Sequence, residues 1–129
     1  LILLDFEVGH FGDPAFDLGF FLTHLVIKSV FIEHRIQDYL LLVRTFLSNY
    51  WSQMSGRLGL DQLENLQERA MMNLGACLIA RVDGKSPVEY LDDPVVKSVV
   101  RSIGTRLLTQ TPTDWSQLME IVSQASMSE

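Results

Sequence analysis

Apolar residues recur every three or four positions along most of this chain, and that spacing restricts its fold more than any other feature. The spacing is clearest over residues 31–54, where the apolar positions are Ile32, Ile36, Tyr39, Leu40, Val43, Phe46, Leu47 and Tyr50. Side chains at this spacing lie on one face of an α-helix. The pattern therefore predicts a long amphipathic helix over residues 31–54 within a mainly α domain.

Signals for helix ends predict where the next elements begin. Asp13 before Pro14 is typical of an N-cap residue followed by proline at the first helical position, and it predicts a helix over residues 14–26. Gly56 and Gly59 then predict a loop after the long amphipathic helix.

A capping box formed by Asp61 and Glu64 predicts a further helix, with Gly84 as the C′ residue after its end. Its buried face is expected to hold Leu63, Leu66, Ala70, Leu74, Cys77 and Leu78. A cap residue followed by proline recurs within residues 86–89, where it predicts a short helical turn. It recurs again at Asp93, where it predicts a helix.

The two ends of the chain differ in pattern. Residues 115–122 predict a last helix, and residues 123–129 should fray. At the start, Leu1 to Leu4 are apolar on both faces, as in a buried strand. A lone strand leaves its backbone groups unpaired, and no second strand is predicted, so we expect partner strands to precede Leu1 in a longer protein.

The composition is that of one globular domain over residues 1–129, with 47% hydrophobic residues and a net charge of −6. This charge argues against binding to nucleic acid or to an anionic membrane, because both depend on basic patches. Cys77 is the only cysteine, so an intrachain disulfide is excluded and a reducing compartment is expected. Charges interrupt the apolar runs before the roughly 20 residues of a membrane span, which favours a cytoplasmic protein.

Two carboxylates follow the predicted strand. Asp5 and Glu7 lie two positions apart, so both would point to the same side of an extended chain. A carboxylate at the edge of a core is unfavourable unless a cation or hydrogen-bond donors meet it. Mg²⁺ is commonly held by one or two carboxylates together with substrate phosphates. Asp5, with Glu7 as a second ligand, is therefore a candidate metal site, although a solvated strand end also explains the pair.

The segment LLDFEVGHFGDPAFDLGFFL resembles the aminoglycoside phosphotransferase and choline kinase-like superfamily of small-molecule kinases, in which a strand ending in Asp precedes a GDPaxDla element. The stretch ARVDGKSPVEYL is similar to one in some bacterial members. The resemblance implies the helical, substrate-binding C-terminal subdomain of a protein kinase-like α+β fold. Residues 1–12 would then be a metal-binding strand and loop, and residues 13–126 a helical bundle.

The resemblance also implies roles for the acidic residues. Asp5 matches the aspartate that coordinates the Mg²⁺ bridging the phosphates of ATP. Asp17 matches an aspartate that accepts hydrogen bonds from the backbone of the catalytic loop, and Asp13 caps the helix. Glu7 stands where protein kinases have glycine. Many small-molecule kinases of this group also lack that glycine and have glutamate there. Mg²⁺ and ATP are therefore the expected cofactors of the intact protein.

The catalytic loop of that superfamily, which resembles HGDxxxxN, does not occur in this sequence, nor do the glycine-rich nucleotide loop and the ATP-contacting lysine. Phosphoryl transfer needs several groups positioned at once, so we expect the chain to be inactive alone and the catalytic base to lie upstream of Leu1. The chain would contribute the metal ligand and the acceptor pocket. The acceptor would be a hydroxyl of an aminoglycoside, choline or a sugar-like molecule.

Other side chains have both a functional and a structural interpretation. His10, Arg81 and Lys85 could face the substrate cleft, whereas a solvent-facing loop and local ion pairs at a helix end explain them without a ligand. His24 and His34 lack a second ligand at metal spacing and are expected to be ordinary partly buried or surface residues.

The aromatic residues are expected to pack in the core; they are Phe16, Phe20, Phe21, Phe46, Tyr50 and Trp51. Phe20 and Phe21 could instead face the part of the protein outside this chain, which would leave an apolar patch through which the chain could self-associate.

Two other functions stay open. The chain could be a noncatalytic helical interaction module derived from a kinase-like fold. It could also be an unrelated Mg²⁺-dependent hydrolase that uses Asp5, Glu7 and Asp13, although neither a base nor a nucleophile is evident for that reaction.

Overall fold

The structure is a computed structural model that describes residues 1–2, 4, 9, 11–84 and 91–127. Within these residues the chain forms five α-helices and one 3₁₀ turn. They are α1 (Pro14–Phe31), η1 (Glu33–Arg35), α2 (Ile36–Met54), α3 (Leu60–Asp83), α4 (Pro94–Thr109) and α5 (Trp115–Met127). The prediction of a mainly α chain is therefore confirmed.

No strand is formed at the described residues of the segment predicted to be one. Leu1, Ile2 and Leu4 have irregular backbone and exposed side chains. A strand gains its backbone hydrogen bonds from a neighbouring strand, and the described residues offer none. The derivation of this bundle from a kinase-like α+β fold stays a prediction.

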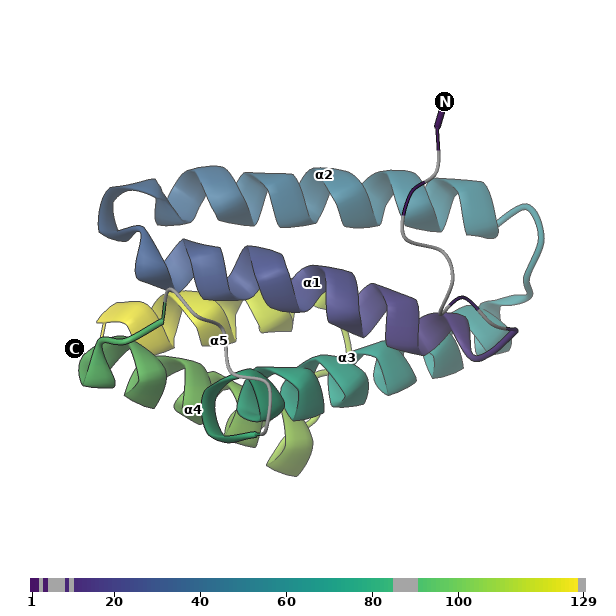
Figure 1. Ribbon diagram of the computed structural model, residues 1–129. Helices are drawn as coiled ribbons and strands as arrows, with labels where there is room; N and C mark the ends of the chain where they lie inside the picture. The colour runs from purple at the N-terminus through teal and green to yellow at the C-terminus, as the bar shows by residue number, and fades with distance from the viewer. Residues whose placement is uncertain (3, 5–8, 10, 85–90, 128–129) are drawn as a thin grey trace.

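The helices form a bundle in which successive helices alternate in direction (Figure 1). α1 contacts each of the other four helices, and α3 packs between α1 and α4. α5 closes the bundle against α4 and α2. Because α1 touches every other helix, its position determines how the rest of the bundle assembles.

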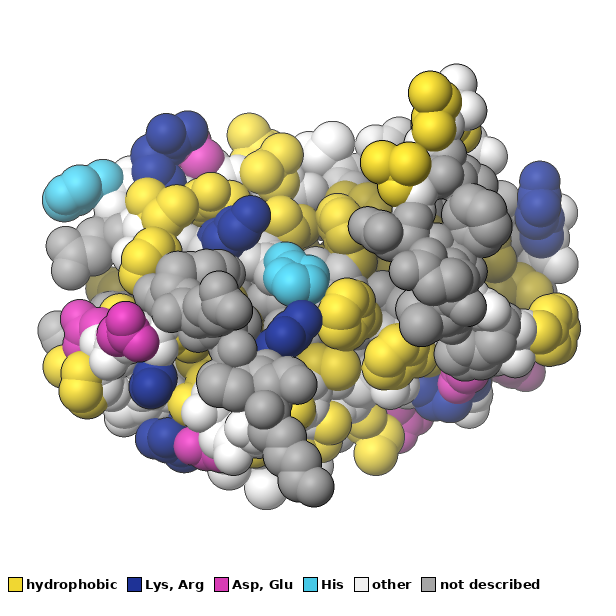
Figure 2. All heavy atoms as spheres, viewed as in Figure 1, with side chains coloured by type: hydrophobic (Ala, Val, Ile, Leu, Met, Phe, Trp, Pro, Cys, Tyr) yellow, Lys and Arg dark blue, Asp and Glu magenta, His cyan; other side chains and the backbone are white. Residues whose placement is uncertain are grey.

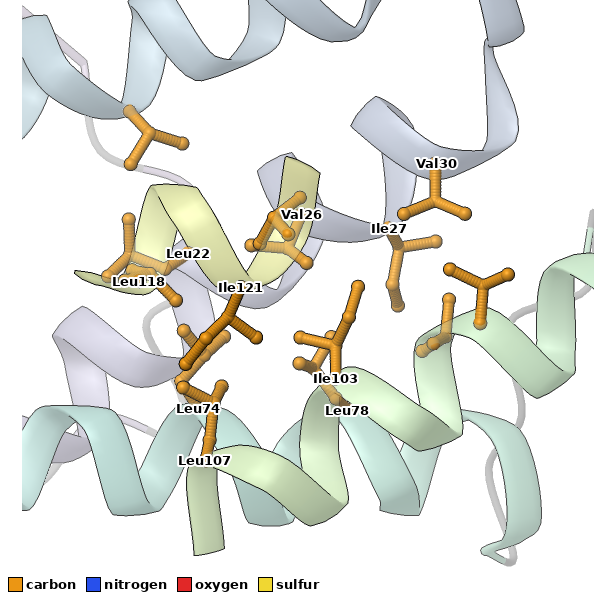
Figure 3. Packing of buried hydrophobic residues seen from close by; sticks show 14 of the residues in the cluster. Leu22, Val26, Ile27, Val30, Leu74, Leu78, Ile103, Leu107, Leu118 and Ile121 are labelled. Atoms are coloured by element: carbon orange, nitrogen blue, oxygen red, sulfur yellow. The ribbon is translucent and has the colours of Figure 1, made fainter. Parts of the chain in front are cut away.

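The core gathers where α1, α3, α4 and α5 converge (Figure 3). Its buried side chains include Leu22, Val26, Ile27, Leu74, Leu78, Ile103, Leu107, Leu118 and Val122. A second, smaller cluster lies near the start of α1 and consists of Ala15, Leu18, Leu66 and Ala70. Burying each large aliphatic side chain stabilises the fold by about 1.5–3 kcal/mol, so these contacts supply most of the driving force.

Glycines allow the closest approaches between helices. A Cβ added to Gly19 on α1 would lie 2.7 Å from the Cβ of Asn73 and 2.8 Å from the backbone nitrogen of Leu74 on α3. Gly75 of α3 and Gly104 of α4 face each other, since a Cβ on Gly75 would lie 3.0 Å from the carbonyl oxygen of Gly104. α3 therefore packs closely against α1 at Gly19 and against α4 at Gly75 and Gly104, because glycine has no side chain to separate the two backbones.

The start of α1 is confirmed, and its end lies further along the chain than predicted. The Asp13 carboxylate accepts a hydrogen bond from the backbone N–H of Ala15 at 3.0 Å, and Pro14 is the first helical residue. The helix continues to Phe31, because Ile27 and Val30 are buried against the core. For that reason the next long helix begins at Ile36, after η1, and the prediction of one helix over residues 31–54 is wrong at its start.

The start of α3 differs from the predicted capping box. The helix begins at Leu60, and the backbone N–H of Gly59 donates to the side-chain oxygen of Gln62 at 2.9 Å. Asp61 therefore lies inside the first turn instead of capping it. At the other end, α3 stops at Asp83, directly before Gly84 as predicted, and Gly84 is its C-cap residue, with its backbone N–H donating to the carbonyl oxygen of Ala80 and a φ of −86°.

The last two helices largely match the sequence pattern. Asp93 caps α4 by accepting from the backbone N–H of Val95 at 2.8 Å, as predicted. The short turn predicted at residues 86–89 lies outside the described residues. α5 runs to Met127, so the predicted fraying from residue 123 is wrong; Ala125 packs against the core and extends the helix.

α1 is long and apolar enough to cross a membrane by length and composition, with 18 residues of mean hydropathy 1.3. However, 44% of that window is buried inside the bundle. A helix that packs against all the others in a bundle can reach the same length and mean hydropathy. Its apolar character is thus accounted for by its central position, and the expected cytoplasmic location stays a prediction.

Gly19→Ala is expected to destabilise the fold by about 1–3 kcal/mol, because the added methyl group overlaps the backbone of α3 and forces the helices apart. The better helix propensity of alanine offsets only about 1 kcal/mol. Urea unfolding would measure the difference. Gly56→Ala is the control, since a Cβ at Gly56 meets nothing within 4 Å. Equal unfolding midpoints for Gly19→Ala and the wild type would contradict this close contact.

Candidate functional site

The described residues that the sequence suggested for function lie at the start of α1 and at the end of α3, which packs beside the middle of α1. Asp13 caps α1, Asp17 lies in its first turn, and Arg81 lies in the last turn of α3. The predicted site residues outside the described part of the chain are Asp5, Glu7, His10 and Lys85.

Asp13 joins α1 to α3 in addition to capping α1. Its two carboxylate oxygens accept hydrogen bonds from Arg69, at 2.9 Å from Nε and 3.1 Å from Nη2. Such a two-point contact fits the planar guanidinium to the carboxylate and fixes the orientation of both groups. The Asp13 carboxylate therefore caps α1 and also joins it to α3, whereas the support of a catalytic loop predicted for Asp13 stays a prediction.

The Asp13–Arg69 pair also shifts the protonation of both groups. The hydrogen bond from Arg69, followed by that from the backbone N–H of Ala15, lowers the pKa of Asp13. In return, the hydrogen bond to Asp13 raises the pKa of Arg69. Both side chains are nearly half exposed, so the pair contributes modestly to the stability of the fold.

Asp17 lies exposed on the first turn of α1. It makes no hydrogen bond or ion pair with the other described residues. A negative charge at this end of a helix is favoured by the helix dipole. Burial, followed by the negative charge of Asp17, raises the pKa of Tyr50 on α2. The contact between Asp17 and a catalytic loop stays a prediction.

Arg81 lies over the exposed side of α1. Its guanidinium carbon is 5.5 Å from the centre of the Phe20 ring, a cation–π arrangement. The ring of Phe20 meets His24 edge-on, with 5.2 Å between ring centres. Partial burial, followed by the positive charges of Arg81 and Lys28, lowers the pKa of His24. Arg81 thus forms part of a local cluster on the α1 surface.

The phenylalanines of α1 are not in the core. Phe16, Phe20 and Phe21 are 48%, 40% and 43% exposed, so the prediction that they pack in the core is wrong. The face of α1 that enters the core holds smaller side chains such as Leu18 and Leu22, which leaves the phenylalanines on the opposite side. The alternative expectation of an exposed apolar patch at Phe20 and Phe21 agrees with the structure. Figure 2 shows hydrophobic side chains gathered over α1 and α2 on this face.

The aromatic residues of α2 fit the prediction better. Phe46, Tyr50 and Trp51 are partly buried and pack against the smaller core cluster. The ring of Phe46 contacts Phe21, with 4.4 Å between centres, so it links the exposed phenylalanines to the bundle.

Two further predictions concern Cys77 and the two histidines on helices. Cys77 is partly buried, and burial raises the pKa of its thiol, as expected for a structural cysteine. His34 is exposed and His24 is partly buried, as predicted. Asp83 forms its ion pair with Arg101 of α4, at 2.7 Å, and thereby ties the end of α3 to a different helix.

No group of three or more His, Cys, Asp and Glu residues that could hold a metal ion occurs in the part of the chain that the structure describes. Asp5 and Glu7 lie outside that part, so the metal site predicted for them stays a prediction. Their carboxylate oxygens are the kind of ligand that Mg²⁺ prefers.

Arg69 was not identified from the sequence, although it holds Asp13. The two residues are 56 positions apart, and no local pattern links them. The only sequence signal was the cap at Asp13 itself, which predicts a bond to its own helix and not one to α3. The pairing follows from the parallel packing of α1 and α3, which periodicity alone does not specify.

A scan against protein-family models and searches of curated proteins and of solved structures found no match to this chain. The resemblance to small-molecule kinases therefore consists of the segment from Leu3 to about Leu22 and the stretch around Arg81.

Asp13→Asn should isolate the contribution of the Asp13–Arg69 ion pair, because asparagine still caps a helix but carries no charge. The folded-state pKa of Asp13 is lowered, so the pair stabilises the fold above the unfolded-state pKa of about 3.9. That contribution disappears as the pH falls through the folded-state pKa. The variant should melt at a lower temperature than the wild type at pH 7, and the difference should vanish in acid.

Thermal melts of both proteins between pH 7 and pH 2 would measure this convergence. Asp61→Asn is the matched control, since Asp61 is also an exposed aspartate near a helix start and has no ion-pair partner among the described residues. A difference for Asp13→Asn that does not change with pH would show that the ion pair is not its cause.

The protonation of His24 can be followed directly by NMR. The imidazole should titrate below the ordinary value of about 6.5, because it is partly buried and lies near two positive charges. Arg81→Gln removes one of those charges and should move the titration midpoint upward. A midpoint at or above the ordinary value in the wild type would contradict the described surroundings of His24.

Proposed function

We propose that this chain is the helical C-terminal part of an ATP-dependent phosphotransferase that acts on a hydroxyl group of a small molecule. The observation that supports the proposal is the form taken by the GDPAFDLGFF segment. Asp13 caps α1, Pro14 opens it, and Asp17 lies exposed in its first turn. This is the local structure that the resemblance implies for the element following the metal-binding aspartate.

In this proposal the acidic segment before α1 binds the metal. Asp5 would coordinate Mg²⁺, and Glu7 is a second candidate ligand. When bound, Mg²⁺ neutralises charge on the phosphates of ATP during transfer. Asp17 would hold the catalytic loop by accepting its backbone N–H groups, while the Asp13–Arg69 pair fixes the start of α1 against α3.

The general base would come from a catalytic loop that this sequence does not contain. Without the base and the nucleotide loop, the chain alone should show negligible turnover. The helical bundle would shape the acceptor site, for which His10, Arg81 and Lys85 are candidate contacts. The net charge of −6 suits a cationic acceptor such as an aminoglycoside or choline, and a sugar-like acceptor fits equally well. A cytoplasmic location is part of the same proposal.

The test is Mg²⁺-dependent consumption of ATP by the complete gene product that includes this chain. Asp5→Ala should lower kcat roughly 10²- to 10³-fold, the usual effect of losing one group that stabilises charge in the transition state. Asp61→Ala is the control, because it removes an exposed carboxylate from α3. Activity that persists in full after Asp5→Ala would contradict the role assigned to Asp5.

The second candidate function is a noncatalytic helical interaction module. The exposure of Phe16, Phe20 and Phe21 favours it, because apolar surface of this kind is typical of protein contacts. A gene product that binds no nucleotide, and whose partner binding is unchanged by Asp5→Ala, would support this function over the phosphotransferase.

A further inference from the structure

The exposed side of α1 carries aromatic residues between an acidic end and a basic end. Asp17, Phe20, Phe21, His24 and Lys28 follow the spacing of three and four that places side chains along one stripe of a helix. The two phenylalanines are 40% and 43% exposed, Asp17 and Lys28 are exposed, and His24 is partly buried. We refer to these five residues as the α1 stripe.

Contacts within the molecule hold the aromatic rings of the α1 stripe in place. Phe21 packs against Phe46 of α2, and Phe20 lies beneath Arg81 and against the edge of His24. Side chains already fixed before association lose little conformational entropy when they are covered. The aromatic part of the α1 stripe is therefore preorganised.

We propose that the α1 stripe is self-complementary and that two copies of the chain associate through it with their α1 helices antiparallel. In a twofold pair, a residue i of one copy contacts j of the other, and j contacts i in return. Placing Asp17 opposite Lys28 of the other copy also places Phe21 opposite His24, because both pairs are symmetric about the midpoint of Leu22 and Thr23. Each end of the interface then pairs Asp17 of one copy with Lys28 of the other, with aromatic contacts between the two ends.

The charges select this arrangement over others. Parallel helices would bring Asp17 against Asp17 and Lys28 against Lys28, and like charges in contact oppose association. The net charge of −6 also opposes nonspecific contact between copies. Lys28 carries a positive charge that can meet Asp17 of the other copy. Neither Lys28 nor Asp17 has an ion-pair partner among the described residues.

Sedimentation equilibrium of the 129-residue chain over a range of concentrations tests the proposal. The wild type should show a monomer–dimer equilibrium. The double variant Phe20→Ser, Phe21→Ser should raise the dimer dissociation constant by at least about tenfold, since aromatic residues at the centre of an interface contribute most to binding. The matched control is Leu41→Ser, Leu42→Ser on α2, where both leucines are more than 50% exposed. It should leave the equilibrium unchanged.

Charge exchange tests the antiparallel register without altering the aromatic residues. Asp17→Lys alone and Lys28→Asp alone should each weaken the dimer, because each places like charges opposite one another. The combined variant Asp17→Lys, Lys28→Asp restores both opposite-charge contacts and should recover dimerisation. Circular dichroism of every variant would verify that α1 remains helical.

Several results would overturn the proposal. They are a chain that stays monomeric at all concentrations, a dimer that persists in the phenylalanine variant, and a dimer lost in the leucine control instead. Failure of the combined charge variant to recover after both single variants weaken the dimer would exclude this register. A monomeric chain whose phenylalanines become protected only in the complete gene product would assign the α1 stripe to a contact within that protein.

Discussion

The close packing of α1 against α3 is the contact on which the rest of this fold depends. It is possible because Gly19 has no side chain where the two helices meet, and a single methyl group there would overlap Asn73 and Leu74. α1 also contacts α2, α4 and α5, so a change in its distance from α3 would alter the whole core. The Asp13–Arg69 pair closes the same contact at its N-terminal end. The close contact at Gly19 therefore fixes the orientation of α1, and with it the positions of the polar residues on this helix.

The two sides of α1 serve different purposes. The buried side, with Leu18, Leu22 and Val26, joins the core clusters and accounts for the apolar character of the helix. The other side presents Asp17 and the exposed phenylalanines to solvent. The proposed phosphotransferase function and the proposed self-association both use Asp17 in the first turn of this helix, and the self-association also uses the phenylalanines in its middle and Lys28 in its last turn. Both depend on the same orientation, which the contact with α3 imposes.

Local signals in the sequence predicted the helix starts at Asp13 and Asp93, because a cap involves only neighbouring residues and leaves a recognisable pattern. They failed at Asp61, because Gly59 is the N-cap residue of α3 and the side chain of Gln62 accepts its backbone N–H. The Asp13-Pro14 start signal identified α1 as a helix but did not show which of its two apolar faces would be buried. Contacts between distant segments, such as that between Asp13 and Arg69, could not be derived because they depend on the packing order of the helices. Asp5 and Glu7, the centre of the predicted site, lie outside the described residues.

The proposed phosphotransferase function depends on the binding of a divalent metal by the acidic segment before α1. Paramagnetic broadening by Mn²⁺, added in place of Mg²⁺ to the isotopically labelled chain and followed by NMR, tests it most directly. The account predicts that broadening is greatest for residues 4–17 and disappears from them in Asp5→Asn. Broadening spread evenly over the exposed carboxylates of α3 and α5, or unchanged in Asp5→Asn, would contradict it.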